Sequence, residues 1–266
     1  MDELTLAMDE GRQVDIIYTD FEKAFDKVPH RRLLSKLSSY GVNTQLLEWI
    51  NAFLSNRSYV VQINDSKSVP RSVLSGIPQG SVLGPLLFVI FINDLPDVNC
   101  GLCNTLLFAD DAKLYKYISG IGDATILSGC CENFSAWSKY WLMSLNVDKC
   151  KVLTITNKQS ANIIDFKYCI TSSLGIPVEL EHIKDCKDLG VIFDTSLSFG
   201  NHIQEKTNTA FKMLGLIKQN VKDLDFASFI LLYKTLVRSH LEYAVSVWNP
   251  YLKSFIYNLE KVKKEQ

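Results

Sequence analysis

The chain has 266 residues, of which 47% are hydrophobic and 21% charged, and its formal net charge is −1. This balance is typical of a globular protein and excludes a globally disordered chain, while the length allows one large domain or two small ones. No run of about 18 apolar residues is present, so the sequence predicts no membrane span. Residues 1–12 are acidic and lack the basic-then-apolar pattern of a secretory signal.

Hydrophobic periodicity predicts an alternation of strands and helices in the first 156 residues. Short segments rich in β-branched and aromatic residues are predicted as strands: 14–21, a hairpin of 57–63 and 68–74, a strand-turn-strand at 104–117, and 151–156. Apolar residues at helical spacing predict helices at 30–41, 43–56, 81–95 and 123–141. The helix at 81–95 is apolar on nearly every side and is expected to be buried.

The end of the chain is predicted to be helical. After a strand at 188–194, helical spacing begins at about residue 199 and predicts helices at 202–220 and 226–248. The fold class is therefore α+β, followed by an all-helical end. Residues 201–266 carry 10 Lys and Arg against 6 Asp and Glu, a net charge of +4. A basic end of this kind suits contact with phosphate, although chance placement of surface charges explains it equally well.

Two adjacent aspartates, Asp110 and Asp111, follow an apolar run at the expected turn within 104–117. Two carboxylates about 4 Å apart repel each other by roughly 4 kcal/mol at an effective dielectric constant near 20, so such a pair takes up a proton or binds a cation. The strand at 14–21 reaches Asp20 after a similar apolar run. If neighbouring strands bring all three carboxylates to one edge of a sheet, they could hold two Mg²⁺ ions. Aspartate also favours turns, so a purely structural role is equally consistent with these residues taken alone.

The seven cysteines are scattered, and Cys100 and Cys103 form a CxxC pair without a second pair at zinc-ribbon spacing. Structural zinc normally needs four ligands. Free thiols in a reducing compartment are therefore favoured over a metal or redox site.

Longer motifs surround the aspartates in a fixed order. They are YTDFEKAFDKVPH (18–30), SGIPQGSVLGPLLFVIFIND (75–94), FADD (108–111), LNVDKCK (145–151), KDLGVIFD (187–194) and LVRSHLEYAVSVWNPY (236–251). In this combination the sequence resembles a reverse transcriptase of the LINE type, from a non-long-terminal-repeat retrotransposon of the jockey-like kind. The resemblance extends from about Gln13 to the end of the chain.

The resemblance implies a polymerase palm, an antiparallel sheet packed on helices, over residues 13–195 and a helical thumb-like region over 196–266. The implied activity is RNA-directed DNA polymerisation: deoxynucleoside triphosphates are added to the 3′-hydroxyl of a DNA primer on an RNA template, with Mg²⁺ or Mn²⁺ as cofactor. The fingers and endonuclease of full-length relatives are expected to be largely absent. A catalytically inactive remnant that only binds nucleic acid or a partner is therefore the alternative. An intracellular location, nuclear and/or cytoplasmic, is implied, and the oligomeric state stays open.

The resemblance also assigns roles to residues. Asp20, Asp110 and Asp111 would be catalytic and metal-binding, with Asp110 the more direct ligand. Phe25 would lie under the incoming sugar and exclude a 2′-hydroxyl, or else it is a core residue. The other nucleotide-binding candidates are Phe21, Gln79, Gly80 and Lys149, and the turn that supports the primer end is Leu189 and Gly190. Lys149 would lie near the triphosphate, and a solvated surface lysine is the alternative for it.

Overall fold

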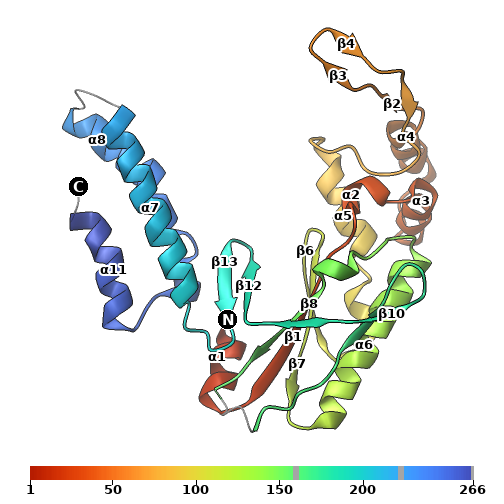
Figure 1. The fold of residues 1–266 in the computed structure, drawn as a ribbon. Helices are drawn as coiled ribbons and strands as arrows, with labels where there is room; N and C mark the ends of the chain where they lie inside the picture. Colours follow the sequence, from red (N-terminus) through yellow and green to blue (C-terminus); the bar gives the residue numbers. More distant parts are fainter. Residues whose placement is uncertain (158–161, 221–224, 265–266) are drawn as a thin grey trace. The chain divides into compact units, whose positions relative to one another are not determined.

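The computed structural model describes residues 1–157, 162–220 and 225–264, and it confirms the α+β class (Figure 1). Its centre is a five-stranded sheet with the strand order β11-β8-β1-β7-β6. The bounds of these strands are β1 (Gln13–Thr19), β6 (Asn104–Phe108), β7 (Asp111–Ile118), β8 (Lys151–Ile155) and β11 (Glu181–Ile183). Strand β1 is buried along almost its whole length, as expected for the central strand of a sheet that is covered on both faces.

The chain divides into two compact units. Residues 14–152 and 162–182 form the first, which we call the sheet unit, and residues 1–13, 153–161 and 183–266 form the second, the helical unit. This grouping places residues 183–195 with the helices, whereas the sequence-based division placed them with the sheet.

Helices α3 (His30–Ser39), α4 (Thr44–Leu54), α5 (Leu83–Ile92) and α6 (Ile121–Tyr140) of the sheet unit occupy the predicted segments. The side chain of Asn43 accepts a hydrogen bond from the Leu46 amide at 2.9 Å, so it caps α4. The expectation of a fully buried helix at 81–95 is wrong. One side of α5 packs into the core, while Leu86 and Val89 are exposed.

The predicted hairpin at 57–74 is present as two short ladders. Strand β2 (Ser58–Tyr59) pairs with β5 (Arg71–Ser72), and β3 (Gln62–Ile63) pairs with β4 (Ser66–Lys67), both antiparallel. The turn between β3 and β4 contains Asn64 at φ +52°, a conformation that asparagine tolerates well.

Three short strands of the sheet unit were not predicted from the sequence. Strand β9 (Cys169–Thr171) pairs with β10 (Pro177–Glu179), and β11 forms one edge of the main sheet. Strand β9 also packs on α6, which in turn packs on β7.

The helical unit contains α1 (Asp2–Asp9), α7 (Gly200–Asn220), α8 (Phe226–Leu232), a π-helix (Tyr233–Arg238), α9 (Ser239–Glu242), α10 (Val245–Trp248) and α11 (Lys253–Lys264). Two predictions need correction here. The strand expected at 188–194 is a hairpin of β12 (Asp185–Asp188) and β13 (Val191–Asp194).

The second correction concerns the helix expected at 226–248, which is interrupted at Ala244, where φ is +52°. The indole N–H of Trp248 donates to the carbonyl of Tyr243 at 2.8 Å and so satisfies a carbonyl at this break. In the part of the chain that the structure describes, no helix combines the length and the hydropathy needed to cross a bilayer.

Candidate active site

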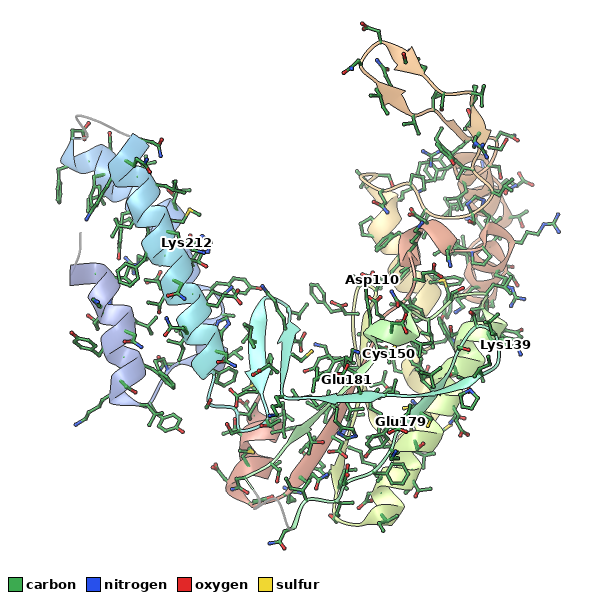
Figure 2. All side chains as sticks on the ribbon, in the orientation of Figure 1. Asp110, Lys139, Cys150, Glu179, Glu181 and Lys212 are labelled. Carbon is green, nitrogen blue, oxygen red and sulfur yellow. The ribbon has the colours of Figure 1, made fainter. Side chains whose placement is uncertain are left out.

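The three predicted aspartates lie at the ends of neighbouring strands. Asp20 directly follows β1, while Asp110 and Asp111 lie where β6 turns into β7. Asp110 is labelled in Figure 2. Strands β1 and β7 are neighbours in the sheet, and the hydroxyl of Thr19 donates to the carbonyl of Ala112 at 2.9 Å. The end of β1 therefore lies beside the start of β7, and the sheet brings Asp20 to the hairpin that carries the other two carboxylates.

The turn between β6 and β7 is as short as a hairpin allows. Phe108 pairs with Asp111, which leaves only Ala109 and Asp110 in the loop. Ala109 adopts φ +51°. This left-handed conformation costs a non-glycine residue roughly 1–2 kcal/mol. Such strain persists only where the surrounding structure over-determines it, and here the register of the two strands fixes the position of Asp110 at the tip.

A lysine lies beside the first aspartate. The Nζ atom of Lys149 is 3.4 Å from Oδ2 of Asp20, with the two side chains 67% and 28% exposed. Two backbone hydrogen bonds hold the lysine-bearing segment in place: the amide of Asn146 donates to the carbonyl of Asp20 at 2.8 Å, and the amide of Glu22 donates to the carbonyl of Ser144 at 2.8 Å. The chain around Lys149 thus runs alongside the residues that follow β1.

Cys150 follows this lysine and is buried. Burial raises the pKa of its thiol to about 11. The thiol therefore stays protonated at neutral pH and places no second negative charge beside Asp20.

The donor chemistry fits a hard divalent cation. Three carboxylates are available, of which Asp20 and Asp110 are half-buried and Asp111 is exposed, and Mg²⁺ prefers such oxygen ligands. Among the described residues, however, no group of three or more His, Cys, Asp or Glu side chains is already gathered around one point where a metal ion could bind. Asp20 is paired with Lys149 instead.

The loop that carries Gln79 and Gly80 is bound to the segment after β1. The amide of Gly76 donates to the carbonyl of Val28 at 2.9 Å, and the amide of Ile77 donates to that of Phe25 at 2.7 Å. The side-chain amide of Gln79 donates to the Asp26 carboxylate at 3.1 Å. Asp26 is therefore a main attachment point of this loop.

The two glycines of this loop differ. At Gly76, with φ +92°, a Cβ atom would lie 2.6 Å from the carbonyl oxygen of Asp26. At Gly80, with φ +77°, a Cβ would meet nothing within 4 Å. The close backbone approach within the protein is thus at Gly76, which the sequence reasoning missed, and Gly80 leaves an open face. The Nε2 atom of His30 also donates to the carbonyl of Gly76 at 2.7 Å, so His30 supports this loop.

The two phenylalanines proposed as nucleotide-binding residues have different environments. The Phe21 side chain is buried and stacks on Phe134 at a centroid distance of 5.6 Å, so only its backbone remains for the predicted contact. Phe25 is half-buried and stacks on Phe88 at 4.3 Å. Phe25 therefore packs in the core on one side, and because it is only half-buried, its contact with the sugar stays a prediction.

The predicted primer-supporting turn belongs to the helical unit. Leu189 and Gly190 have φ values of +45° and +83° and connect β12 to β13. This pair of positive φ angles is typical of a type I′ hairpin turn. The hydroxyl of Tyr243 donates to the Leu189 carbonyl at 2.8 Å, and a Cβ on Gly190 would lie 3.1 Å from the Tyr243 ring. Tyr243 was not singled out in the sequence, because it lies more than 50 residues away from the turn.

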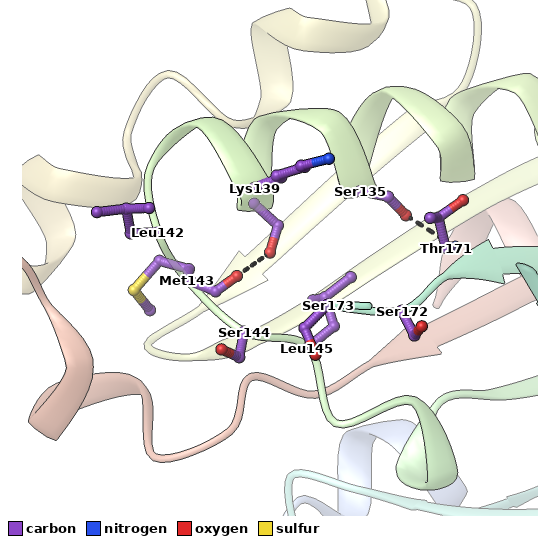
Figure 3. Close-up of a pocket in the computed structure, with 10 residues that line it drawn as sticks. Ser135, Lys139, Leu142, Met143, Ser144, Leu145, Thr171, Ser172 and Ser173 are labelled. Carbon is purple, nitrogen blue, oxygen red and sulfur yellow. Dashed lines mark hydrogen bonds between the residues drawn. The ribbon is translucent and has the colours of Figure 1, made fainter. Parts of the chain in front are cut away.

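A cavity of about 220 Å³ lies between the end of α6 and the segments 142–145 and 171–173 (Figure 3). The hydroxyl of Ser138 donates to the carbonyl of Met143 on one side, and the amide of Thr171 donates to the Ser135 hydroxyl at 3.3 Å on the other. None of the predicted site residues lines it. Its wall includes Ser144, whose carbonyl accepts a hydrogen bond from the amide of Glu22. The cavity therefore adjoins the segment that is bonded to the residues after β1.

Comparison with known proteins identifies the family. Residues 4–218 match the family described as reverse transcriptase (RNA-dependent DNA polymerase). The chain belongs to this reverse transcriptase family. The match confirms the resemblance drawn from the motifs and the class of enzyme that the chain resembles.

Two similar relatives come from Drosophila mobile elements. The RNA-directed DNA polymerase from mobile element jockey of Drosophila funebris is 30% identical over 255 residues, which is 91% of this chain and 26% of that protein. The probable RNA-directed DNA polymerase from transposon X-element of Drosophila melanogaster is 23% identical over 278 residues, which is 100% of this chain and 29% of that protein. The chain thus spans between a quarter and a third of the length of these two relatives.

Among solved structures, telomerase from Candida albicans in complex with the TWJ fragment of telomeric RNA is similar, with 13% identity and a TM-score of 0.45. The similarity covers 98% of this chain and 46% of that chain.

Proposed function

We propose that this chain is the palm-bearing part of a retrotransposon RNA-directed DNA polymerase, which adds deoxynucleotides to a DNA primer on an RNA template. One observation carries the proposal. In a chain of the reverse transcriptase family, the end of β1 and the β6–β7 turn bring Asp20, Asp110 and Asp111 to neighbouring positions. The nuclear and/or cytoplasmic location implied by the resemblance belongs to the same proposal.

Asp20, Asp110 and Asp111 would hold the Mg²⁺ or Mn²⁺ ions. When bound, the cations activate the primer hydroxyl and neutralise charge that develops on the leaving pyrophosphate. The role of the protein is then to hold its carboxylates on rigid elements. Two strand ends and a two-residue turn do this more precisely than a long loop would.

Lys149 would exchange partners during the reaction. Its ammonium group now faces Asp20 from an exposed position on a flexible stem. Once Asp20 binds a cation, the lysine is free to contact the triphosphate of the incoming nucleotide. A lysine suits this role because its charge is compact and its side chain can move without disturbing the backbone.

The loop of Gln79 and Gly80 would lie against the nucleotide and the template strand. The open face at Gly80 allows a close approach of the ligand, and Gln79 offers a donor and an acceptor. Phe25 would limit the space under the sugar, and the Leu189-Gly190 turn would support the primer end. The positions of these residues within their own units support the proposal.

The test is extension of a DNA primer on an RNA template by the full chain in Mg²⁺ and in Mn²⁺. Asp110→Asn removes one carboxylate charge at nearly constant shape and should slow extension by about 10³-fold, which corresponds to roughly 4 kcal/mol of activation free energy. Asp97→Asn, at an exposed position outside the site, is the matched control and should extend normally. Equal extension by Asp110→Asn and the unmodified chain would refute the metal assignment.

The alternative is a catalytically inactive remnant that binds nucleic acid or a partner without turnover. It predicts salt-sensitive RNA binding and no incorporation in either metal.

A further inference from the structure

The part of the chain that lies between α3 and α5 in the sequence forms a surface that contains none of the proposed catalytic residues. It consists of the exposed side of α4 and the hairpin of residues 57–74, and we call it the hairpin surface. All residues from 56 to 72 are exposed, and in Figure 1 the β3–β4 end of the hairpin extends beyond α4. Six large apolar side chains here are 45–86% exposed: Tyr59, Val60, Val61, Ile63, Val69 and Leu74. Exposed apolar side chains in such number favour an interaction site, and a lone two-stranded hairpin is only marginally stable in water.

The hairpin carries more positive than negative charge. Arg57, Lys67 and Arg71 accompany Asp65 between residues 57 and 74, and the exposed side of α4 adds one further carboxylate, Glu48. No acidic side chain in the described part of the chain forms an ion pair with any of the three cations, whereas several lysines elsewhere in the sheet unit pair with glutamates. Three cations without counter-charges attract a polyanion.

Two aromatic rings on α4 and a guanidinium group in the segment after it form a row. Trp49 and Phe53, four residues apart, stack with a centroid distance of 6.1 Å and an interplanar angle of 10°, and Trp49 is 55% exposed. The guanidinium of Arg57, four residues further on, is 6.0 Å from the Phe53 ring. The Arg57 carbonyl accepts the Val73 amide at 2.9 Å, which ties the base of the hairpin to the end of α4. Nucleic-acid bases stack on such exposed rings and on arginine planes.

We propose that the hairpin surface binds single-stranded RNA, with phosphates at Arg57, Lys67 and Arg71 and bases against Trp49 and Tyr59. This deepens the proposed function and rests on it for the identity of the strand, an RNA template. A second copy of the chain that docked through the same surface fits less well, because it would bring the same three cations into the interface. An RNA strand supplies one phosphate per nucleotide and flat apolar base faces.

The experiment measures binding of a short, labelled, single-stranded RNA to the full chain as a function of KCl concentration. Removing three phosphate contacts with Arg57→Gln, Lys67→Gln and Arg71→Gln together should lower the salt slope by about 2, because each contact contributes roughly 0.7 for single strands. At about 0.1 M KCl the same arithmetic gives a roughly 100-fold loss of affinity. Trp49→Ala should weaken binding about tenfold without changing the slope, because it removes stacking and no charge.

The controls separate this proposal from the proposed function. Lys167→Gln removes an exposed charge of the sheet unit outside the hairpin surface and should leave the affinity within about twofold. Asp110→Asn should lose primer extension but keep its RNA affinity. Loss of catalysis can therefore be distinguished from loss of RNA binding at the hairpin surface. The substituted side chains are exposed, so urea unfolding should confirm an unchanged fold. Undiminished RNA affinity of the triple variant overturns the proposal. It is also overturned if the unmodified chain binds no RNA, or if the triple variant only disrupts a dimer.

Discussion

Two glycines in one loop allow backbone conformation and close packing to be separated by a matched pair of substitutions. Gly76 and Gly80 both have positive φ, +92° and +77°. A Cβ at Gly76 would lie 2.6 Å from the oxygen, 2.7 Å from the Cα and 2.8 Å from the carbonyl carbon of Asp26, whereas a Cβ at Gly80 would be free of contacts within 4 Å. Alanine at either position has the same side chain and a similar backbone strain, but only Gly76→Ala creates an overlap.

The expected magnitudes follow from these distances. Gly80→Ala should lower the free energy of unfolding by about 1–2 kcal/mol, the cost of a left-handed conformation for an L-residue. Gly76→Ala bears a similar cost and adds an overlap with backbone that three hydrogen bonds to residues 25–28 hold in place. Overpacking of this kind costs a further 1–3 kcal/mol, so the total is about 2–5 kcal/mol.

Urea unfolding of the two variants and the unmodified chain measures the difference. The result expected is a clearly lower midpoint for Gly76→Ala than for Gly80→Ala at an unchanged slope. Equal midpoints would show that backbone conformation alone explains both glycines, and the inference that this loop is packed against the segment after β1 would be wrong.

Three further predictions concern other parts of the chain. The Lys36 ammonium donates to Oδ1 of Asp94 at 2.6 Å. Lys36→Met should therefore lower the free energy of urea unfolding by about 2–4 kcal/mol, which is less than for a fully buried pair because Asp94 is 34% exposed. An unchanged free energy of unfolding would contradict a stabilising pair. Burial, with a smaller effect of nearby lysines, lowers the pKa of His202 to about 4 from 6.5. The unfolded state therefore binds a proton first, and about 3 kcal/mol of stability is lost as pH falls from 6.5 to 4. His202→Gln should remove that part of the pH dependence of unfolding, and an identical profile would contradict the burial argument. Phe25→Ala should raise ribonucleotide incorporation relative to deoxynucleotides, whereas an unchanged ratio would mean that the ring, stacked on Phe88, only packs the core.

The parts of the fold that the sequence predicted are those set by local patterns. The hairpin of residues 57–74 and the helices of the sheet unit follow from residues close in sequence. The strand 188–194 was wrong because its turn at Leu189 and Gly190 is recognisable only as a hairpin with residues 185–188. The break at Ala244 depends on an indole N–H that returns to Tyr243, which no periodicity reveals.

The candidate site divides in the same way. The aspartates could be selected from their place after apolar runs and within longer motifs, and the sheet order brings their strands together. The need for glycine at Gly76 depends on Asp26, 50 residues earlier, and the support of Leu189 depends on Tyr243. Such contacts between distant segments are not encoded in local spacing, so the sequence reasoning missed the need for glycine at position 76.

Binding of Mn²⁺ to the full chain, followed by electron paramagnetic resonance, tests most directly whether two strand ends build one cation site. Asp20→Asn and Asp110→Asn lie 90 residues apart in the sequence and should each abolish the same bound signal, while Asp97→Asn leaves it intact. If Asp20→Asn binds Mn²⁺ as tightly as the unmodified chain while Asp110→Asn does not, the carboxylates do not share a site and the polymerase assignment of Asp20 is contradicted.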